Sequence, residues 1–350
     1  MRLTTSTVEV PLRSSFTAAH GTMDVRPLML VALADADGLV GHGEAAPLQS
    51  YDGVATADVR AALEDCRGEL AAAVLGDVVD PDARAELLAR CERRAVLPQA
   101  LAAIDLALWD LAGRAQGEPV WRLLGASAAP HVAVNWTIGA PDRSGAAREA
   151  QWAYDAGYRT VKLKVGTGDD AGRVAAVRAV AAGRTMAIRL DANGAWSPEE
   201  ALRWLEVLAP AGIELCEEPV AGAEAIEELT PAAPIPLAID ESAVAPVALM
   251  RRCAAAICLK VTRCGGITGT IATARRAREL GYEVILTSTF DGPLGIAAAV
   301  HAAAALAPDR ACGLATLALF AGRPNPLPVE HGMITAPPGP GLGDGLAAWY

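Results

Sequence analysis

The chain has 350 residues, of which 52% are hydrophobic and only 4% aromatic, and its formal net charge at pH 7 is −11. A chain of this length and composition can bury a large core of alanine, valine and leucine in one or two domains. The acidic balance argues against a nucleic acid as partner, because the chain lacks the basic surface that would neutralise phosphates.

Targeting signals and cysteine usage favour the cytoplasm. The first fifteen residues lack the apolar segment of a secretory signal. The most apolar stretch, Gly295 to Pro308, is short and interrupted by His301, which predicts a packed helix and argues against a membrane span. Seven scattered cysteines form no CxxC pair, so we expect reduced thiols.

The amino-terminal third shows strand patterns followed by helical ones. Residues Arg2–Leu12 have an extended pattern, and the ADADG turn within Leu28–Leu39 indicates a β-hairpin. Helical patterns follow over Ala55–Leu75 and Asp82–Arg94. The stretch Pro98–Gly117 begins at a proline, carries an apolar stripe and ends at a glycine, which predicts a helix.

From His131 onward the pattern changes to repeated strand–helix units. Short apolar runs alternate with helical stretches at a period of roughly 20 to 30 residues, as in a (β/α)8 barrel. An open doubly wound sheet is the alternative, but no GxGxxG motif opens the first unit. The expected strands are Val132–Gly139, Thr160–Val165, Met186–Ala192, Ile213–Glu218, Pro236–Glu241, Ala256–Val261, Glu283–Thr289 and Cys312–Leu317.

The tail from Ala321 is rich in proline and glycine and is expected to fold back on the first part of the chain. The order of elements predicts an α/β protein with a (β/α)8-type barrel and an α+β amino-terminal domain. We place the α+β domain at residues 1–125, completed by the tail 321–350, and the barrel at residues 126–320.

Charged residues stand at the ends of the expected barrel strands. In TVKLKVG (Thr160–Gly166), alternate residues form one apolar face, so Lys162 and Lys164 share the other face. Lysines are costly to bury, and two neighbouring lysines repel each other. The following strands end, in order, in Asp191, Glu217, Asp240 and Lys260.

The three acids predict a divalent metal site. Barrel closure would bring the carboxylates of Asp191, Glu217 and Asp240 to one level, where unpaired anions repel each other. A hard cation relieves this repulsion, and Mg²⁺ prefers oxygen ligands with positions left open for water or substrate. We therefore expect Mg²⁺, with Mn²⁺ as a substitute.

The lysines then suggest proton transfer. A metal held against a substrate carboxylate makes the α-proton easier to remove, because it stabilises the enediolate that forms. Lys164 and Lys260 would flank the metal on opposite sides. A lysine near a cation has a lowered pKa and can act as a base, and Lys162 would lower the pKa of Lys164 further.

Structural explanations exist for each of these residues taken singly. Lys162 and Lys164 could lie on an exposed edge strand, and Lys260 could be a surface charge. Asp191 and Asp240 could each cap the following helix. Such separate structural roles do not explain why three acids would stand at the same level of the barrel. His301 is more simply explained as structural.

Several motifs together resemble the muconate-lactonizing subgroup of the enolase superfamily. These are KLKVG, RLDANGAW, EEP, DES and LKVTRCGGI, with GHGEAAPLQSY similar to a capping-domain loop and LAAIDLALWDLAGRAQGEPVWRLLG to the helix that enters the barrel. The resemblance covers nearly the whole chain. It implies a barrel with a capping domain, a lysine-and-magnesium site for a small carboxylate substrate, and a homo-oligomer.

The resemblance also implies roles for individual residues. Loops around Ser14–Arg26 and Leu48–Gly53 would close over the substrate. Asp291 stands where the family usually carries Glu and either contacts substrate or caps a turn, and Thr137 either contacts substrate or packs. Glu217 and Glu218 are adjacent, so only one can face the metal. The implied metal ligands are Asp191, Glu217 and Asp240, the acid/base pair is Lys164 and Lys260 with Lys162 in support, and Asn193 and Glu218 lie behind them.

Among the family's reactions, three motifs look most like o-succinylbenzoate synthases, the dehydrating enzymes of menaquinone biosynthesis. These motifs are GEAAPL, RLDANGAW and ACGLATLALF. Racemisation of N-succinylamino acids and muconate cycloisomerisation stay open as alternatives. Dipeptide epimerases resemble one another in an Asp-x-Asp in the eighth strand that holds the substrate ammonium. Gly313 and Ala315 occupy that region here, which argues against dipeptide epimerisation.

Two hypotheses lie outside this family. An aldolase on the same barrel could form a Schiff base through Lys164 or Lys260. A barrel that binds metal without catalysis is the other alternative.

Overall fold

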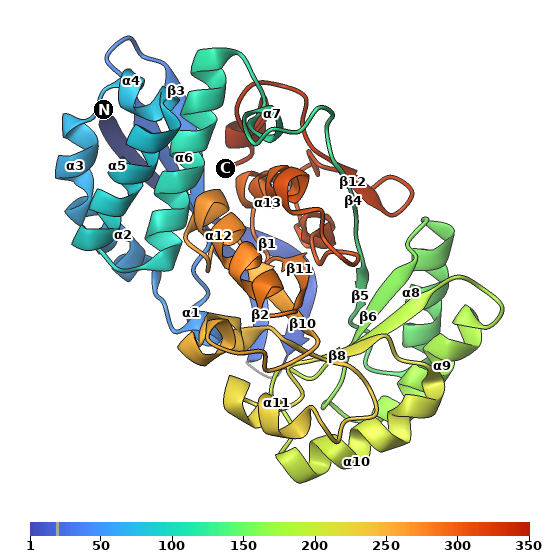
Figure 1. The fold of residues 1–350 in the computed structure, drawn as a ribbon. Coiled ribbons are helices and arrows are strands. Elements are labelled where there is room, and N and C mark those ends of the chain that lie inside the picture. The colour runs from blue at the N-terminus through green and yellow to red at the C-terminus, as the bar shows by residue number, and fades with distance from the viewer. Residues whose placement is uncertain (19–20) are drawn as a thin grey trace.

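The computed structural model of the chain describes residues 1–18 and 21–350. Figure 1 shows an amino-terminal part with a helical cluster beside a barrel-like part that contains the remaining helices. The first part is built on an antiparallel sheet in the order β1-β2-β3. Its strands are β1 (Arg2–Ala18), β2 (Gly21–Ala34) and β3 (Val40–Ala45).

The turn between β2 and β3 is the ADADG segment expected from the sequence. The Asp35 carboxylate accepts hydrogen bonds from the backbone N–H of Asp37 at 3.0 Å and of Leu39 at 2.8 Å. An Asp side chain that satisfies backbone donors in this way stabilises a turn locally. The predicted hairpin is confirmed, and β1 is longer than the predicted Arg2–Leu12.

Helix α6 is the central helix of the amino-terminal part and is buried along nearly its whole length. It packs closely on β3, where a Cβ at Gly43 would lie 2.0 Å from the Ala103 carbonyl oxygen. The expected helix over Ala55–Leu75 is broken at Cys66 into α2 and α3. The helices are α1 (Gln49–Asp52), α2 (Thr56–Asp65), α3 (Arg67–Ala72), α4 (Leu75–Val79), α5 (Pro81–Arg94), α6 (Pro98–Gln116) and α7 (Val120–Leu123).

The second part contains a parallel sheet whose seven strands, within the described residues, follow the order β11-β10-β9-β8-β7-β6-β5. Sequential strands are neighbours throughout, as in a barrel wall. The strands are β5 (Trp136–Ile138), β6 (Thr160–Lys164), β7 (Ala187–Asp191), β8 (Leu215–Glu217), β9 (Leu237–Ile239), β10 (Ala256–Lys260) and β11 (Glu283–Thr287).

Two isolated bridges join the edges of this sheet. Cys312 pairs with Val134, just before β5, and Gly313 pairs with Thr287 at the end of β11. The expected eighth strand, Cys312–Leu317, is therefore present only at its first two residues. From Ala315 the chain forms the 3₁₀ helix η4 (Ala315–Leu319). A short apolar run fits a strand or a helix equally well, which explains the error.

The expected first strand is also interrupted. Residues 131–133 form β4, which pairs with β12 of the tail, and the parallel strand begins only at Trp136. After β9 the chain forms two short 3₁₀ helices where the other units have a longer helix. These are η2 (Glu241–Val244) and η3 (Pro246–Leu249), and β4 and β12 span His131–Ala133 and Met333–Thr335.

Three helices of the barrel part, α8, α9 and α10, start at side-chain caps provided by Asp142, Asp169 and Ser197. Ser197 accepts from Glu200 N–H while the Glu200 carboxylate accepts from Ser197 N–H, with Pro198 in the first turn. The helices are α8 (Arg143–Asp155), α9 (Asp170–Ala181), α10 (Pro198–Leu208), α11 (Ala223–Leu229), α12 (Gly266–Glu279) and α13 (Pro293–Leu306), with the 3₁₀ helix η1 (Ala209–Ala211) after α10.

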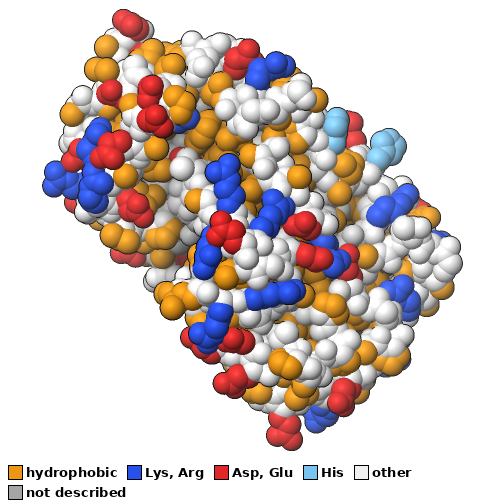
Figure 2. All heavy atoms as spheres, in the orientation of Figure 1, with side chains coloured by type: hydrophobic (Ala, Val, Ile, Leu, Met, Phe, Trp, Pro, Cys, Tyr) orange, Lys and Arg blue, Asp and Glu red, His pale blue; other side chains and the backbone are white. Residues whose placement is uncertain are grey.

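The carboxyl-terminal tail pairs with β4 through β12 and also contacts the amino-terminal part. Leu342 N–H donates to the Asp110 carboxylate at 2.7 Å, and the Tyr350 hydroxyl donates to Glu44. The last element is η5 (Leu346–Trp349). Figure 2 shows basic side chains on one face of the molecule with acidic ones among them, and Arg276–Glu279 is one ion pair on α12. Of the described helices, none is at once long and apolar enough to cross a bilayer.

Candidate active site

A cavity lies at the carboxyl ends of the barrel strands, where barrel folds carry their sites. Residues from the amino-terminal part form one side of it, including Met23 from β2 and Leu48, Ser50 and Tyr51 from the loop after β3 and from α1. The predicted loop Leu48–Gly53 therefore lies at the cavity. Of the predicted loop Ser14–Arg26, residues 19–20 lie outside the described residues, and Gly21, Thr22 and Met23 line the cavity.

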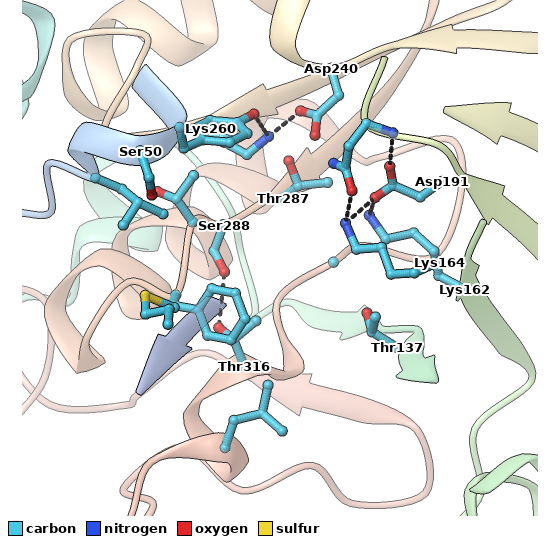
Figure 3. Close-up of a pocket in the computed structure, with 18 of the residues that line it drawn as sticks. Ser50, Thr137, Lys162, Lys164, Asp191, Asp240, Lys260, Thr287, Ser288 and Thr316 are labelled. Atoms are coloured by element: carbon cyan, nitrogen blue, oxygen red, sulfur yellow. Dashed lines mark hydrogen bonds and ion pairs between the residues drawn. The ribbon is translucent and has the colours of Figure 1, made fainter. Parts of the chain in front are cut away.

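One wall of the cavity carries both lysines of β6. Lys164 lies beside Asp191 in the sheet register. Its Nζ donates to Asp191 Oδ2 and to Asn193 Oδ1, each at 2.7 Å. Lys162 Nζ lies 2.9 Å from Asp191 Oδ2 and 2.9 Å from Glu217 Oε2. The two lysines thus share one carboxylate oxygen (Figure 3).

Lys260 lies on the facing wall of the cavity, at the end of β10 (Figure 3). Its Nζ forms an ion pair with Asp240 and donates to the Tyr51 hydroxyl at 2.9 Å. The Tyr51 ring also faces this ammonium, with Nζ 5.1 Å from the ring centroid. The structure therefore places the cavity between Lys164 and Lys260.

Glu217 and Glu218 point in different directions although they are adjacent. Glu217 accepts from Lys162, whereas Glu218 accepts from the backbone N–H of Asp240 at 2.7 Å and of Ser242 at 3.1 Å. Glu218 has a positive φ of 39°, a conformation that costs energy for a residue with a side chain. Glu218 therefore fixes the backbone after β9 and does not line the cavity.

Asn193 connects the lysine wall to the next loop. Its amide Nδ2 donates to Glu241 Oε1 at 2.9 Å while its Oδ1 accepts from Lys164. Like Glu218, it has a positive φ, here 46°. Asn193 itself lines the cavity, and its predicted role behind the metal ligands stays a prediction.

The buried charges shift one another's proton affinity. Burial raises the pKa of Asp191, but Lys162 and Lys164 outweigh it and hold that pKa well below its ordinary value. Burial raises the pKa of Glu217, and the nearby Asp191 adds to this against the opposing effect of Lys162. Burial lowers the pKa of Lys260, but Asp240 outweighs it and holds the pKa well above its ordinary value.

Asp191, Glu217 and Asp240 suit a hard cation in the chemistry of their side chains. All three are buried, with exposed fractions of 1%, 1% and 5%, at the ends of adjacent strands or just beyond them. Buried carboxylates need cations, and carboxylate oxygens are what Mg²⁺ prefers. In this structure the lysine ammonium groups supply that charge. Among residues 1–18 and 21–350, no set of three His, Cys, Asp or Glu side chains is gathered in a metal-binding arrangement.

The structure separates the two predicted substrate contacts. Thr137, at β5, lines the cavity. Asp291 is buried beyond it, where its carboxylate accepts from the Thr289 hydroxyl at 3.1 Å. Burial raises the pKa of Asp291, against the opposing effect of Arg26. Asp291 is thus not among the lining residues, and its role stays a prediction.

Sequence reasoning did not single out four residues that line the cavity. Tyr51 comes from a loop 209 positions before Lys260, and no local pattern links the two. Thr287 ends an apolar strand as Lys260 does, so its position carried a usable signal. Ser288 and Thr316 meet only because the chain closes after β11.

Comparisons with known proteins agree with this geometry. Residues 1–125 match the model of the mandelate racemase/muconate lactonizing enzyme amino-terminal domain, and residues 145–347 match that of the enolase carboxyl-terminal domain-like family. Muconate cycloisomerase 1 of Rhodococcus opacus is 31% identical, over 99% of this chain and 96% of its own length.

Two solved structures show the same fold over nearly the whole chain. A dipeptide epimerase from Enterococcus faecalis V583, complexed with Mg and the dipeptide L-Leu-L-Tyr, is 26% identical with a TM-score of 0.85, over 97% of this chain and 98% of its own. The N-succinyl Arg/Lys racemase from Bacillus cereus ATCC 14579 is 25% identical with a TM-score of 0.88, over 98% of this chain and 95% of its own.

Proposed function

Because the chain belongs to the mandelate racemase/muconate lactonizing enzyme family of the enolase superfamily, we propose that it removes the proton α to the carboxylate of a small substrate. The observation that carries this proposal is the pair of lysines on facing walls of one cavity. Lys164 and Lys260 can reach a bound molecule from opposite sides. Two-sided access is what proton removal and return require.

Each basic residue has a distinct role in this proposal. Lys164 takes the α-proton at Nζ, and Asn193 holds that nitrogen in place. Lys260 approaches the other face of the substrate from between Asp240 and Tyr51. Lys162 neutralises Asp191 and Glu217 and so keeps the buried acids ionised.

Asp191, Glu217 and Asp240 are the residues that would hold a divalent cation, which we take to be Mg²⁺ with Mn²⁺ as a substitute. Bound there, the ion would supply positive charge to stabilise the enediolate created by proton removal. The dipeptide epimerase complexed with Mg supports this assignment by similarity. The carboxylates would then exchange part of their lysine contacts for the cation.

We infer that the enediolate is reprotonated, which makes the reaction an isomerisation. Lysines on both walls favour racemisation of an N-acylated amino acid, since one lysine can remove the proton and the other can return it. Similarity to a muconate cycloisomerase and to an N-succinyl Arg/Lys racemase supports an isomerase. Assembly into a homo-oligomer stays a prediction by analogy.

Dehydration by an o-succinylbenzoate synthase is the second candidate. The motifs GEAAPL, RLDANGAW and ACGLATLALF favour it. In that reaction Lys164, once protonated, would help the hydroxyl group leave on the same face, while Lys260 would remain a stabilising cation. Racemisation and dehydration thus make different use of Lys260.

The test is α-proton exchange in D₂O with Mg²⁺ present, followed by NMR, for N-succinylamino acids and for the cyclohexadiene precursor of o-succinylbenzoate. We expect Lys164→Ala to lower the exchange rate at least about 100-fold, as loss of a general base does. A rate in Lys164→Ala equal to that of the unaltered protein would overturn the assignment.

The same assay separates the rival classes. Exchange that is lost with EDTA and restored with Mg²⁺ supports the proposal. Covalent trapping of substrate by borohydride would instead indicate a Schiff base on Lys164 or Lys260. The variant Lys260→Ala distinguishes the two candidate reactions. We expect it to abolish racemisation, which needs a second lysine, and to leave dehydration largely intact.

A further inference from the structure

One hydroxyl group in the cavity has no partner in the described protein. Thr287 ends β11, lines the cavity and is 5% exposed. Its Oγ1 finds no hydrogen-bond partner among residues 1–18 and 21–350. A buried hydroxyl left unpaired is costly, and native proteins seldom keep one without a reason. The Oγ1 is shielded from solvent here, and a change of the Thr287 rotamer would present it to a ligand oxygen in the cavity.

Two further hydroxyl groups lie next along the same wall. Ser288 follows Thr287, and its Oγ lies 2.9 Å from Thr316 Oγ1 on η4. Figure 3 shows Ser288 and Thr316 joined in this way, with Lys164 and Asp191 across the cavity. A pair of hydroxyls uses only one of its two protons internally, so one donor remains for a ligand.

Gly313 packs against Thr287 on this wall. A Cβ at Gly313 would lie 3.1 Å from Thr287 Cγ2 and 3.4 Å from Thr287 Cβ. A larger side chain at position 313 would therefore push Thr287 out of place. Glycine at position 313 thus leaves Thr287 in its observed place.

The charged side chains that line the cavity already have ion-pair partners. Among the described lining residues the charged ones are Lys162, Lys164, Asp191, Asp240 and Lys260. All five form ion pairs with one another or with Glu217. A substrate ammonium at the hydroxyl wall would find no carboxylate there, and burying an unpaired charge is strongly unfavourable.

We propose that Thr287, Ser288 and Thr316 form a subsite for an uncharged oxygen of the substrate, namely the amide carbonyl of an N-acylated amino acid, and that this subsite rejects a free ammonium. The inference rests on the proposed function, since the subsite lies beside the lysines that would act on the α-carbon. Thr287 pairs with Lys260 in the sheet register, which sets the carbonyl next to the reacting centre. Apolar residues of the lining can take the acyl chain, and these are Met23, Leu48, Phe290 and Leu319.

Binding measured by calorimetry with Mg²⁺ present tests the subsite with a readout that does not depend on a rate of turnover. The probes are N-acetyl-L-leucine, N-succinyl-L-leucine and the dipeptide L-Leu-L-Leu. We expect the unaltered protein to bind the N-acylated probes. We expect it to bind the dipeptide at least about tenfold more weakly than these probes, which corresponds to the cost of one unmet hydrogen bond. A dipeptide bound equally well or better would overturn the inference.

Thr287→Val removes the hydroxyl and keeps the shape. We expect affinity for the N-acylated probes to fall about tenfold while Tm stays the same or rises, because the unpaired hydroxyl is lost from the free protein. A purely structural threonine would give the opposite pattern, with Tm lowered and affinity unchanged, and that result would overturn the inference. Thr262→Val is the matched control, since Thr262 is also buried and unpartnered among the described residues but does not line the cavity.

Thr316→Asp tests the selectivity. We expect the preference for N-acylated probes over the dipeptide to fall at least tenfold, because a carboxylate can pair with the ammonium. An unchanged preference would contradict the inference. The proposed function fails in a different way, namely if the bound N-acylated probe does not exchange its α-proton in D₂O.

Discussion

Lys162 is buried between two acids and lines the cavity. Its Nζ contacts Asp191 and Glu217 at 2.9 Å each, so it neutralises two carboxylates that would otherwise repel. Its pKa is lowered by burial but raised more strongly by these two acids, and lies well above its ordinary value. The sequence reasoning expected Lys162 to tune Lys164 by repulsion. In this structure it acts first on the acids.

The variant Lys162→Met should reveal this role. It leaves buried acids without their cation, and breaking a buried pair in this way costs about 3–5 kcal/mol of unfolding free energy. We also expect Mg²⁺ to raise the Tm of the variant more than that of the unaltered protein, because the cation replaces the missing charge. Urea and thermal unfolding with and without Mg²⁺ measure both effects.

Lys164→Met is the matched comparison for this prediction. Asp191 keeps its Lys162 contact in that variant, so we expect a smaller loss of stability and a smaller response to Mg²⁺. Equal stability of Lys162→Met and the unaltered protein in metal-free buffer would contradict the proposed neutralising role.

At the scale of elements, the packing of α6 on β3 positions the amino-terminal loops at the cavity. Gly41 and Gly43 allow this approach, since Cβ atoms there would lie 2.3 Å and 2.0 Å from carbonyl oxygens of α6. The strand continues from β3 into the loop that carries Leu48 and Tyr51. The geometry of the cavity thus depends on a backbone contact far from the chemistry.

Gly43→Ala should weaken this contact. The added methyl group meets backbone atoms that cannot turn away, and overpacking of this kind costs about 1–3 kcal/mol or more. We expect lowered stability in urea and a raised KM, because the loop with Tyr51 shifts. Gly68→Ala in α3 is the control, since a Cβ there meets nothing within 4 Å and alanine favours a helix. A control less stable than Gly43→Ala would contradict the packing argument.

The elements themselves were largely predictable, and their ends less so. Seven parallel strands were predictable because each is a short apolar run, and helical segments separate most of them. The segment Cys312–Leu317 was not, because its run of leucine and alanine fits two periods and only the closure of the sheet decides between them. Helix α2 ends early for a similar reason, since the pattern through Cys66 continues while the chain turns.

Within the candidate site, the residues on strand ends were predictable and the contacts between them were not. Lys164, Asp191 and Lys260 stand at ends that the pattern marks. That Tyr51 meets Lys260 depends on packing between segments 209 positions apart in the chain. Reasoning that proceeds along the sequence does not resolve such partners.

At the scale of the whole molecule, His301 joins three distant segments. It lies in α13, and its Nδ1 accepts from the Trp121 backbone N–H at 3.1 Å, so the proton is on Nε2, 3.1 Å from the Leu342 carbonyl oxygen. The imidazole is fully buried, and burial lowers its pKa to about 4. Both ring nitrogens have structural partners, which explains His301 without a catalytic role.

This histidine makes the fold sensitive to acid. A pKa of about 4 in the folded state, against an ordinary value of 6.5, means that the unfolded chain binds the proton first as the pH falls. The stability is fully present above about pH 6.5 and is lost as the pH falls towards 4, by about 3 kcal/mol in total. Protonation also removes the acceptor for Trp121, which loosens the junction between α7, α13 and the tail.

His301→Gln should flatten this dependence. Glutamine does not titrate, so the difference in unfolding free energy between the unaltered protein and the variant should shrink as the pH falls from 7 to 4.5. Urea unfolding at each pH measures it, and His331→Gln at an exposed position supplies the control. A difference that stays constant over this range would show that His301 does not couple the barrel, the α7 segment and the tail to acid. The expected convergence would place the weak point of the whole molecule at this junction, remote from the lysines and acids of the cavity.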